Sequence, residues 1–353
     1  MPTVNIYYGG FRSQSGGAFF HAINLEKVLS QRGWKVEVIT LDSLPAWCRY
    51  IPHLVERVVN FFYAPFGFIY KADVTKILYR RILNNRVDLR VFEDIYISWN
   101  SNTPSITILH AVWSDNLQAI SVPGGRGRCF RKREIAIING ILHPVATVSY
   151  PYRDYICQEH FNGALTKNID VIELGVDQSK FVSNPEEERE RKSIVYAGAL
   201  EARKNITFLL DVFKRLYDLD SGYKLTIIGW GKNRRKLENF VSEHGLPVRF
   251  LGRLENDKVL SELHRHEIYV HTSVKESFSY SLLEAKLAGL ITCAYSKLEV
   301  PKEFIDVGFD HFLVEEWCYG IKNIYSGSFD EFDGSNYSSE RMTKATLNLA
   351  GLG

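Results

Sequence analysis

The chain has 353 residues, which is long for one ordinary domain and suits two domains of common size. Apolar residues make up 45% and charged residues 24%, a composition that supplies a hydrophobic core and excludes wholesale disorder. The formal net charge is only +2, but residues 1–150 hold 17 Lys and Arg against 10 Asp and Glu. This basic half indicates an anionic partner, and charge alone does not decide between phospholipid, a diphosphate-linked acceptor and nucleic acid.

The targeting and redox signals predict a cytoplasmic protein. The segment MPTVNIYYGG has no cationic stretch followed by an apolar run, and no later segment reaches about 18 uncharged apolar residues. The five cysteines are scattered without a CxxC pair, which argues against a zinc site and against a disulfide framework. We therefore expect a chain that is neither exported nor membrane-spanning, with reduced thiols.

The first forty residues read as strand, glycine loop, helix and strand. VNIYY at 4–8 is β-rich, Gly16 and Gly17 interrupt it, residues 18–33 have helical spacing and WKVEVIT at 34–40 is β-rich again. Gly33 is placed to end the helix. The pattern predicts a βαβ unit.

The same alternation recurs in the second half of the chain. Such alternation predicts parallel sheets covered by helices on both faces, and hence an α/β fold of two Rossmann-like domains. The further strands and helices are expected at residues 193–199, 206–219, 223–229, 248–254, 258–266 and 267–273.

The charged segment SNPEEERERKS at 183–193 suits a solvated connector, and we place the domain hinge there. The predicted domains are residues 1–182, an N-terminal Rossmann-like acceptor domain, and 194–337, a C-terminal donor domain. The tail 338–353 has helical character and is expected to pack back toward the N-terminal domain.

Glycines occur where strands should give way to helices. Gly198 follows SIVYA, Gly229 and Gly231 follow KLTII, and Gly16 and Gly17 follow the first strand. In open parallel sheets ligands bind outside the carboxyl ends of the strands, where glycine loops and helix N-termini present backbone N–H groups to anions. A single glycine at such a position can be required by the turn alone. It is the recurrence of glycine at several strand ends that indicates a ligand site.

A sharper motif is KESFSYSLLEAKLAG, in which seven residues separate Glu276 from Glu284. A helix that starts near Tyr280 would leave Glu276 in the loop ahead of it and place Glu284 about one turn inside. The helix N-terminus and the amides of Phe278, Ser279 and Tyr280 could then hold a diphosphate between the two carboxylates. The alternative is that Glu284 is a solvated helix residue.

Together with several other segments, this motif resembles glycosyltransferase family 4, whose retaining enzymes have the GT-B fold of two Rossmann-like domains facing across a cleft. The resemblance covers most of the chain. It is carried by the opening SGG loop with RGWKVEVIT, and by the segments VATVSYPYRDYI, VIELGVDQSKF, YAGALEARKN, LTIIGWG and VRFLGRLENDKV, in the family's order and spacing.

The resemblance implies roles for particular residues. Glu276 corresponds to the carboxylate that binds the donor sugar, Glu284 to the one that binds the nucleotide ribose, and Lys204 to the phosphate-binding lysine. His110, which ends the apolar run ITILH, matches a histidine near the reacting sugar carbon. A buried structural histidine is the other reading of His110.

The chain departs from the family pattern at the phosphate loop. Ala199 stands where the family usually has arginine, so Arg203 beside Lys204 is expected to supply that cation, unless it is a plain surface cation. Ser277 and Ser279 replace the usual glycines of the Glu-x7-Glu loop.

We therefore expect a retaining, metal-independent glycosyltransferase with no cofactor. It would move a sugar from a nucleotide-diphosphate donor to a hydroxyl of a glycan or lipid-linked acceptor, in cell-surface polysaccharide or glycolipid synthesis. Residues 46–81 and the basic cluster 126–133 suit an anionic inner-membrane surface, although core helices with solvated basic faces explain them equally well. The alternatives are a nucleotide-sugar 2-epimerase of the same fold and a degenerate nucleotide-sugar-binding protein. Nucleic acid is not an expected partner, because no recognition motif is present.

Overall fold

The computed structural model describes residues 1–13, 16–115, 125–181 and 189–353. Within these ranges the chain forms two compact units, each with its own core. Unit 1 contains the chain up to Val176 together with Asn336–Gly353, and unit 2 contains Asp177–Ser335. The predicted connector 183–193 begins outside the described residues, and its last residue, Ser193, opens the first strand of unit 2.

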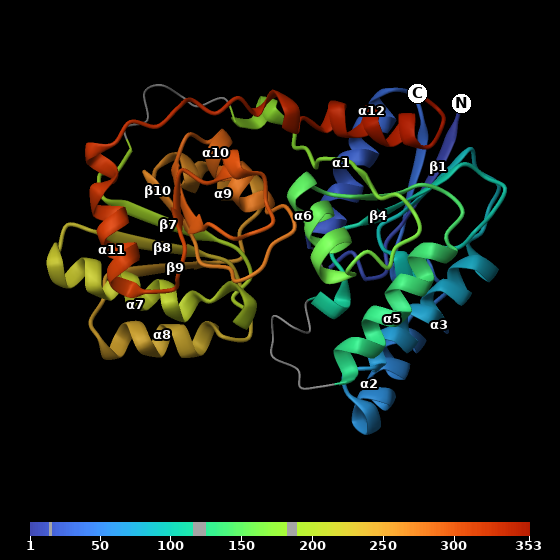
Figure 1. Ribbon diagram of the computed structural model, residues 1–353, viewed down its shortest axis with the longest axis horizontal. Helices are drawn as coiled ribbons and strands as arrows, with labels where there is room; N and C mark the ends of the chain where they lie inside the picture. Colours follow the sequence, from blue (N-terminus) through green and yellow to red (C-terminus); the bar gives the residue numbers. More distant parts are fainter. Residues whose placement is uncertain (14–15, 116–124, 182–188) are drawn as a thin grey trace. The chain divides into compact units, whose positions relative to one another are not determined.

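Unit 1 is built on a six-stranded parallel sheet in the order β2-β1-β3-β4-β5-β6 (Figure 1). The first βαβ unit agrees with the sequence pattern, since α1 ends at Gln31 and Gly33 adopts the left-handed conformation with φ of 82°. The elements are β1 (Thr3–Tyr7), α1 (Gly17–Gln31), β2 (Lys35–Ile39), α2 (Ile51–Tyr63), α3 (Gly67–Ile82), β3 (Leu89–Phe92), β4 (Ser105–Leu109), α5 (Gly125–Gly140), β5 (Val145–Thr147), α6 (Tyr150–Asp154) and β6 (Asp170–Val171).

Unit 2 repeats this architecture with a second parallel sheet in the order β12-β11-β10-β7-β8-β9. In Figure 1, α7 and α8 lie on one side of this sheet and α9 and α10 on the other. Its elements are β7 (Ser193–Ala197), α7 (Ile206–Leu219), β8 (Lys224–Ile228), α8 (Arg234–Glu243), β9 (Val248–Gly252), α9 (Asn256–His264), β10 (Ile268–His271), α10 (Tyr280–Leu287), β11 (Ile291–Tyr295), β12 (Val307–Phe309) and α11 (Val314–Asn323). The predicted fold class of two Rossmann-like α/β domains is confirmed.

The last helix, α12 (Ser339–Leu349), belongs to unit 1 and packs on α1. Ser338 caps it by accepting a hydrogen bond from the Arg341 amide, and Val176 pairs with Ser338 in an isolated parallel bridge. Gly175 fits beside this bridge because a Cβ there would lie 2.2 Å from the Ser338 carbonyl oxygen. The C-terminal segment is thus tied to the end of the first stretch of unit 1.

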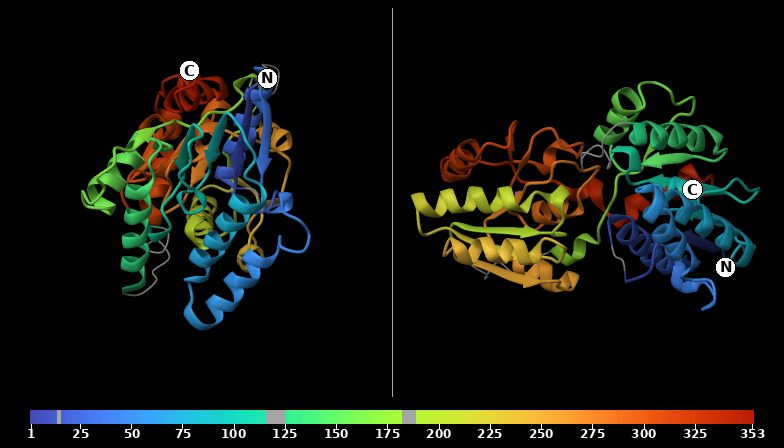
Figure 2. Two further views of the ribbon diagram at one scale, coloured as in Figure 1. Left: turned by 90° about the vertical axis from the view of Figure 1, so that its right-hand side faces the viewer. Right: turned by 90° about the horizontal axis from the view of Figure 1, so that it is seen from below.

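Helices α2 and α3 form an antiparallel pair that extends from the unit 1 sheet (Figure 2). The Gly67 amide donates to Asn60 Oδ1 at 2.9 Å, and Lys71 pairs with Glu56 at 3.1 Å, so the pair is held at its turn and along its length. Of the residues of α2, only Pro52 is fully buried. In the described residues, no helix combines the length and the apolar character needed to cross a membrane.

Candidate active site

The Glu-x7-Glu motif lies between β10 and α10 in unit 2. As expected from the sequence, α10 begins at Tyr280, with Ser279 as its N-cap. Ser279 takes the left-handed conformation with φ of 70°, and its hydroxyl accepts a hydrogen bond from the Leu282 amide at 3.4 Å. A conformation that glycine adopts readily is therefore occupied here by serine, which compensates by capping the helix.

Glu276 is the meeting point of three basic side chains. Its Oε1 is paired with Lys204 Nζ, and it lies 3.2 Å from both Arg203 Nη1 and His271 Nε2. Arg203 also donates to the Lys275 carbonyl, and Thr272 Oγ1 donates to the Lys204 carbonyl at 2.9 Å. These contacts join the loop after β7 to the loop after β10, so two segments 72 residues apart form one charged cluster.

The charge state of this cluster follows from its surroundings. Burial alone would raise the pKa of Glu276, but Lys204, His271 and Arg203 together hold that pKa well below its usual range. Burial lowers the pKa of Lys204 and that of His271, against the opposing effect of Glu276. At neutral pH the cluster therefore contains an ionised carboxylate beside cations from Lys204 and Arg203, and a neutral His271.

Glu284 lies on α10, and its side chain is in a different electrostatic situation. Burial raises its pKa to about 7, and no charge on a described residue opposes this effect. Phe278 is buried, with its ring 5.3 Å from that of Phe304 and 5.6 Å from that of Tyr280. The predicted ligand amides of residues 278–280 thus stand at the start of a helix that is anchored by aromatic packing.

The glycines after β7 and β8 have a packing reason for being glycine. A Cβ on Gly229, whose φ is 140°, would lie 1.8 Å from the Gly198 carbonyl oxygen. A Cβ on Gly198 would lie 2.6 Å from the Tyr196 hydroxyl, and that hydroxyl donates to the Ala199 carbonyl. The close approach of the two loops explains Gly229 and the Tyr196 side chain explains Gly198, and donor binding by Gly198 and Gly229 stays a prediction.

The remaining predicted residues lie in unit 1. Gly16 is the N-cap of α1 and Gly17 its first residue, and both are exposed. His110 directly follows β4, where the sequence pattern placed it at the carboxyl end of a strand. The structure therefore brings Arg203, Lys204 and Glu276 together in one unit and places His110 in the other.

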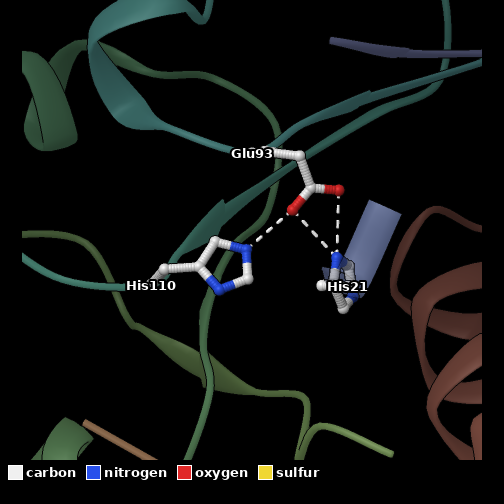
Figure 3. A group of neighbouring side chains, drawn as sticks. All are labelled: His21, Glu93 and His110. Carbon is white, nitrogen blue, oxygen red and sulfur yellow. Dashed lines mark hydrogen bonds and ion pairs between the residues drawn. The ribbon is translucent and has the colours of Figure 1, made fainter. Parts of the chain in front are cut away.

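His110 is part of a hydrogen-bonded group with Glu93 and His21 (Figure 3). His110 Nε2 lies 2.7 Å from Glu93 Oε2, and His21 Nδ1 lies 2.8 Å from the same oxygen and 2.9 Å from Oε1. Glu93 follows β3 and His21 lies on α1, so the group joins two strand ends to a helix. The side chains of His21 and Glu93 are 0% exposed and that of His110 is 14% exposed, which makes His110 the accessible member.

Among the described residues, these three are the group of His, Cys, Asp or Glu side chains whose ligand atoms lie close enough, within 4.8 Å of one another, to hold a metal ion. Hydrogen bonds between the imidazoles and the carboxylate already engage the same atoms. Burial would raise the pKa of Glu93, but His21 and His110 outweigh it and lower that pKa to about 2. An ionised Glu93 bonded to two imidazoles accounts for the geometry.

Sequence reasoning missed His271, Glu93 and His21. The signal that selected His110, a polar residue at the end of an apolar strand, was also present for His271 after EIYV and for Glu93 after LRVF. His21 had no comparable signal, because its position inside a helix shows its partner only once α1 is packed against the sheet.

Residues 177–317 match the model of a known protein family, described as glycosyl transferases group 1. Two curated relatives, both sugar transferases, are similar in sequence to part of this chain. The GtfA subunit of a UDP-N-acetylglucosamine–peptide N-acetylglucosaminyltransferase from Limosilactobacillus reuteri is 27% identical over 51% of this chain and 37% of its own length. An α-1,4-N-acetyl-D-galactosaminyltransferase from Campylobacter jejuni, named for a PP-undecaprenol-linked GalNAc glycan, is 30% identical over 39% of this chain and 37% of its own length. The match thus spans less than two fifths of either relative.

Solved structures resemble this chain over its whole length. Anabaena HepE in complex with UDP-glucose superposes with a TM-score of 0.62 at 15% identity, covering 100% of this chain and 97% of that one. Sucrose-phosphate synthase from Thermosynechococcus elongatus gives a TM-score of 0.67 at 16% identity, covering 99% and 94%. At these identities the likeness concerns the fold, which is that of the GT-B glycosyltransferases.

Proposed function

From the match of residues 177–317 to the group 1 glycosyl transferases, we propose that the chain is a member of that family and that it moves a sugar from a nucleotide-diphosphate donor to a hydroxyl of a glycan or lipid-linked acceptor. We further propose that the transfer retains the anomeric configuration, needs no metal ion and serves cell-surface polysaccharide or glycolipid synthesis. The observation that carries the proposal is the convergence of Lys204, Arg203 and His271 on Glu276 directly ahead of α10.

The cluster suits a diphosphate and a sugar bound side by side. Lys204 and Arg203 would neutralise the charge that grows on the leaving phosphate, and the amides at the start of α10 would bind further phosphate oxygens. Because Glu276 is ionised, it accepts hydrogen bonds, as a carboxylate that orients sugar hydroxyls must. The protein's own cations supply the positive charge, which is the basis for the proposed metal independence.

The proposed reaction balances without a protein nucleophile. The bond between the sugar carbon and the phosphate oxygen breaks, the acceptor oxygen forms a new bond to that carbon from the same face, and the acceptor proton passes to the leaving phosphate. Glu284, a turn inside α10, would accept hydrogen bonds from the ribose hydroxyls, and His110 would contact the sugar. The names of the relatives support this class, since both are sugar transferases.

A direct test replaces Lys204 by alanine and follows release of free nucleotide from UDP-sugar and GDP-sugar donors. We expect turnover to fall on the order of 10²- to 10³-fold, because a cation aimed at the leaving group is lost. Lys214→Ala, on the exposed face of α7, is the control and should keep full activity. Unimpaired turnover in the Lys204 variant would refute the assignment.

Loss of folding must be separated from loss of chemistry in that test. Removing one partner of a buried ion pair costs about 3–5 kcal/mol, because the other charge remains buried alone. Lys204→Arg keeps the charge but not the shape of the ammonium group, and the double variant Lys204→Ala, Glu276→Gln removes both charges. Both should melt closer to the parent protein than the single alanine variant does, yet stay impaired in turnover.

We also propose that the α2 helix rests on an anionic membrane surface that carries the acceptor. Tyr50, Leu54, Val58 and Phe61 are spaced by three or four residues and lie on one face of α2, each between 52% and 82% exposed. The exposed large apolar side chains in and next to this helix are Trp47, Tyr50, Ile51, Leu54, Val58, Phe61, Phe62 and Tyr63. An apolar face of this size indicates a surface that another body covers.

The charges around α2 favour an anionic bilayer as that body. The two acidic residues of α2 and α3 are both neutralised, Glu56 by Lys71 and Asp73 by Arg133 of α5. Among the side chains that the structure describes on α2, α3 and α5, the exposed cations left are Arg57, Arg80, Arg81, Arg128 and Lys132. Apolar side chains beside uncompensated Lys and Arg are typical of helices that lie in the membrane interface.

Vesicle sedimentation tests the membrane contact. The variant Leu54→Ser, Phe61→Ser, Phe62→Ser should lose binding to vesicles of anionic phospholipid at low salt, while Tyr319→Ser, an equally exposed aromatic in unit 2, should not. Binding by the parent protein should weaken as salt rises, because part of it is electrostatic. A parent protein that ignores anionic vesicles would contradict this part of the proposal.

A further inference from the structure

The hydrogen bonds of the His21–Glu93–His110 group determine which ring nitrogens carry protons. Glu93 is ionised, so its oxygens only accept hydrogen bonds. The nitrogens that face it, His21 Nδ1 and His110 Nε2, must therefore both be N–H donors. A neutral His110 that carries its proton on Nε2 has a lone pair on Nδ1.

The geometry leaves that lone pair available to a ligand. Nε2 points to the buried carboxylate, and Figure 3 shows Nδ1 on the side of the ring away from Glu93. No hydrogen bond to His110 Nδ1 is formed within the described part of the chain, and the side chain is 14% exposed. Burial lowers the pKa of His110 against the opposing effect of Glu93, so the ring is neutral at pH 7.

His21 holds the carboxylate of Glu93 in place. Its ring is fully buried, it contacts both oxygens of Glu93, and its own Nε2 is buried with no hydrogen-bond partner among the described residues. The rings of His21 and His110 meet edge to face with centroids 5.2 Å apart. Glu93 is thereby fixed from one side by a residue that reaches no solvent and presented to His110 on the other.

We propose that Glu93, clamped by His21, is a positioning residue that fixes His110 in the Nε2–H form, so that Nδ1 accepts a hydrogen bond from a hydroxyl of the transferred sugar. This inference rests on the proposed sugar transfer and adds two residues that touch no substrate. The physical basis is the same as in other histidine–carboxylate pairs. In such a pair, the hydrogen bond from one ring nitrogen to the carboxylate fixes the tautomer and raises the basicity of the other ring nitrogen.

The first test reads the ring nitrogens directly and needs no enzymatic activity. In protein labelled with ¹⁵N-histidine, the His110 signals, assigned by their loss in His110→Gln, should show a protonated Nε2 and an unprotonated Nδ1 at neutral pH. Glu93→Gln should disturb this pattern, because the amide nitrogen donates a hydrogen bond and competes with the imidazole N–H groups. Glu93→Asp should largely keep it. A His110 protonated on Nδ1 in the parent protein would overturn the proposal.

The second test reads the pH dependence of turnover. Activity should fall on acidification as His110 Nδ1 becomes protonated. Glu93 raises the pKa of His110, so Glu93→Gln should move this acid limb to lower pH and reduce kcat roughly tenfold or more. The other groups that act here are His21 on His110, and Tyr8 and Asp94 near Glu93, and all are unchanged in the variant. Glu37→Gln, on the exposed face of β2, should leave the profile unchanged.

Two outcomes would contradict the positioning role of Glu93 while leaving the proposed sugar transfer intact. If Glu93→Gln lowers the melting temperature but leaves the acid limb in place, the carboxylate is only structural. If a chelator abolishes turnover and Zn²⁺ restores it, with the ring N–H signals lost in the metal-bound protein, the group is a metal site. Failure of sugar transfer itself would appear separately, as no binding of UDP or GDP sugars by a protein whose His110 still shows the fixed tautomer.

Discussion

Lys204 and Glu276 neutralise each other in the protein without its ligand, and this shapes how a donor would enter. A diphosphate adds negative charge to a cluster of two cations and one carboxylate, so it competes with Glu276 for Lys204 and Arg203 while the sugar hydroxyls offer Glu276 new donors. The neutral His271 behind Glu276 limits how far the carboxylate can move. The low dielectric constant of these surroundings strengthens each of these electrostatic interactions.

Glu284 gives a pH-dependent prediction. Its pKa is about 7 without ligand, and an ionised carboxylate accepts both ribose hydroxyls, so donor binding favours loss of its proton. The affinity for UDP-glucose, whose diphosphate diester keeps its charge, should rise with pH up to about 7 and then level off. Below that point it should weaken by at most about tenfold per pH unit. Calorimetric titration across this range measures it.

The matched variant for that experiment is Glu284→Gln, which cannot titrate. It should bind UDP-glucose more weakly at high pH and show a nearly flat profile. A parent protein whose affinity is independent of pH between about 5.5 and about 8 would remove Glu284 from the ribose site.

At the residue scale, the sequence predicted where the residues of one motif lie, while their roles in binding stay predictions. The spacing of Glu276 and Glu284 placed both correctly relative to the start of α10. It could not show that Arg203 and His271 converge on Glu276, or that Glu93 bridges two histidines, because those contacts join residues far apart in the chain that only the packed sheets bring together.

The loops after β7 and β8 are the elements on which the cluster of unit 2 depends. They approach each other so closely that a Cβ on Gly229 or Gly231 would meet the backbone of Gly198 or Leu200, and the hydrogen bonds from Gly198 N–H to the Ile228 carbonyl and from Leu200 N–H to the Trp230 carbonyl hold them together. The loop that carries Arg203 and Lys204 starts from this contact. Its position is therefore set by the two strands rather than by the charged residues themselves.

Gly229→Ala should destabilise unit 2 by about 3 kcal/mol or more. The added methyl group meets the Gly198 carbonyl, and the backbone conformation disfavours any side chain. Gly245→Ala is the matched control, because Gly245 also has positive φ, at 61°, but open space around it, and only the strain of about 1 kcal/mol is expected. Denaturant unfolding of both variants compares the two values, and equal destabilisation would contradict the packing argument.

Element boundaries were predictable where the hydrophobic periodicity agreed with the residues that typically start or end a helix or strand. The helix expected at 206–219 is α7 with the same limits, since a continuous apolar face runs from Ile206 to Leu216. The α2–α3 pair was less accessible to sequence reasoning. Aromatic and basic residues alternate there in a way that fits both a core helix and an interfacial one, and only the packing shows that the apolar face of α2 is left outside.

At the scale of the molecule, the charged cluster of Arg203, Lys204 and Glu276 and the His21–Glu93–His110 group belong to different units, each with its own core. The two halves of the proposed reaction can therefore be tested separately. Variants of Glu276 or Lys204 should weaken nucleotide binding, whereas variants of Glu93 should leave nucleotide affinity unchanged and alter turnover.

Thermal unfolding gives a prediction for the whole chain. UDP-glucose or a related nucleotide sugar that binds unit 2 should raise its melting temperature by mass action, with a stabilisation of about 2.7 kcal/mol at a ligand concentration 100 times Kd. A screen of UDP, GDP, ADP and dTDP sugars would identify the base. No shift with any of them would contradict nucleotide-sugar binding, and binding without turnover across many acceptors would favour a degenerate binding protein.

The sequence predicted two Rossmann-like domains because strands and helices alternate throughout, and it pointed to a terminal helix. It carried no signal for the pairing of Val176 with Ser338, which depends on two segments 162 residues apart meeting after unit 2 has been completed between them.

That pairing has a consequence for biosynthesis. Unit 2 is an insertion between two stretches of unit 1, so a nascent chain that has reached Ser335 already contains all of the second unit while α1 still lacks the helix that covers it. The unit whose synthesis begins first is thus finished last, and a chain that ended before α12 would contain all of unit 2 beside a first unit whose α1 lacks the helix that packs on it.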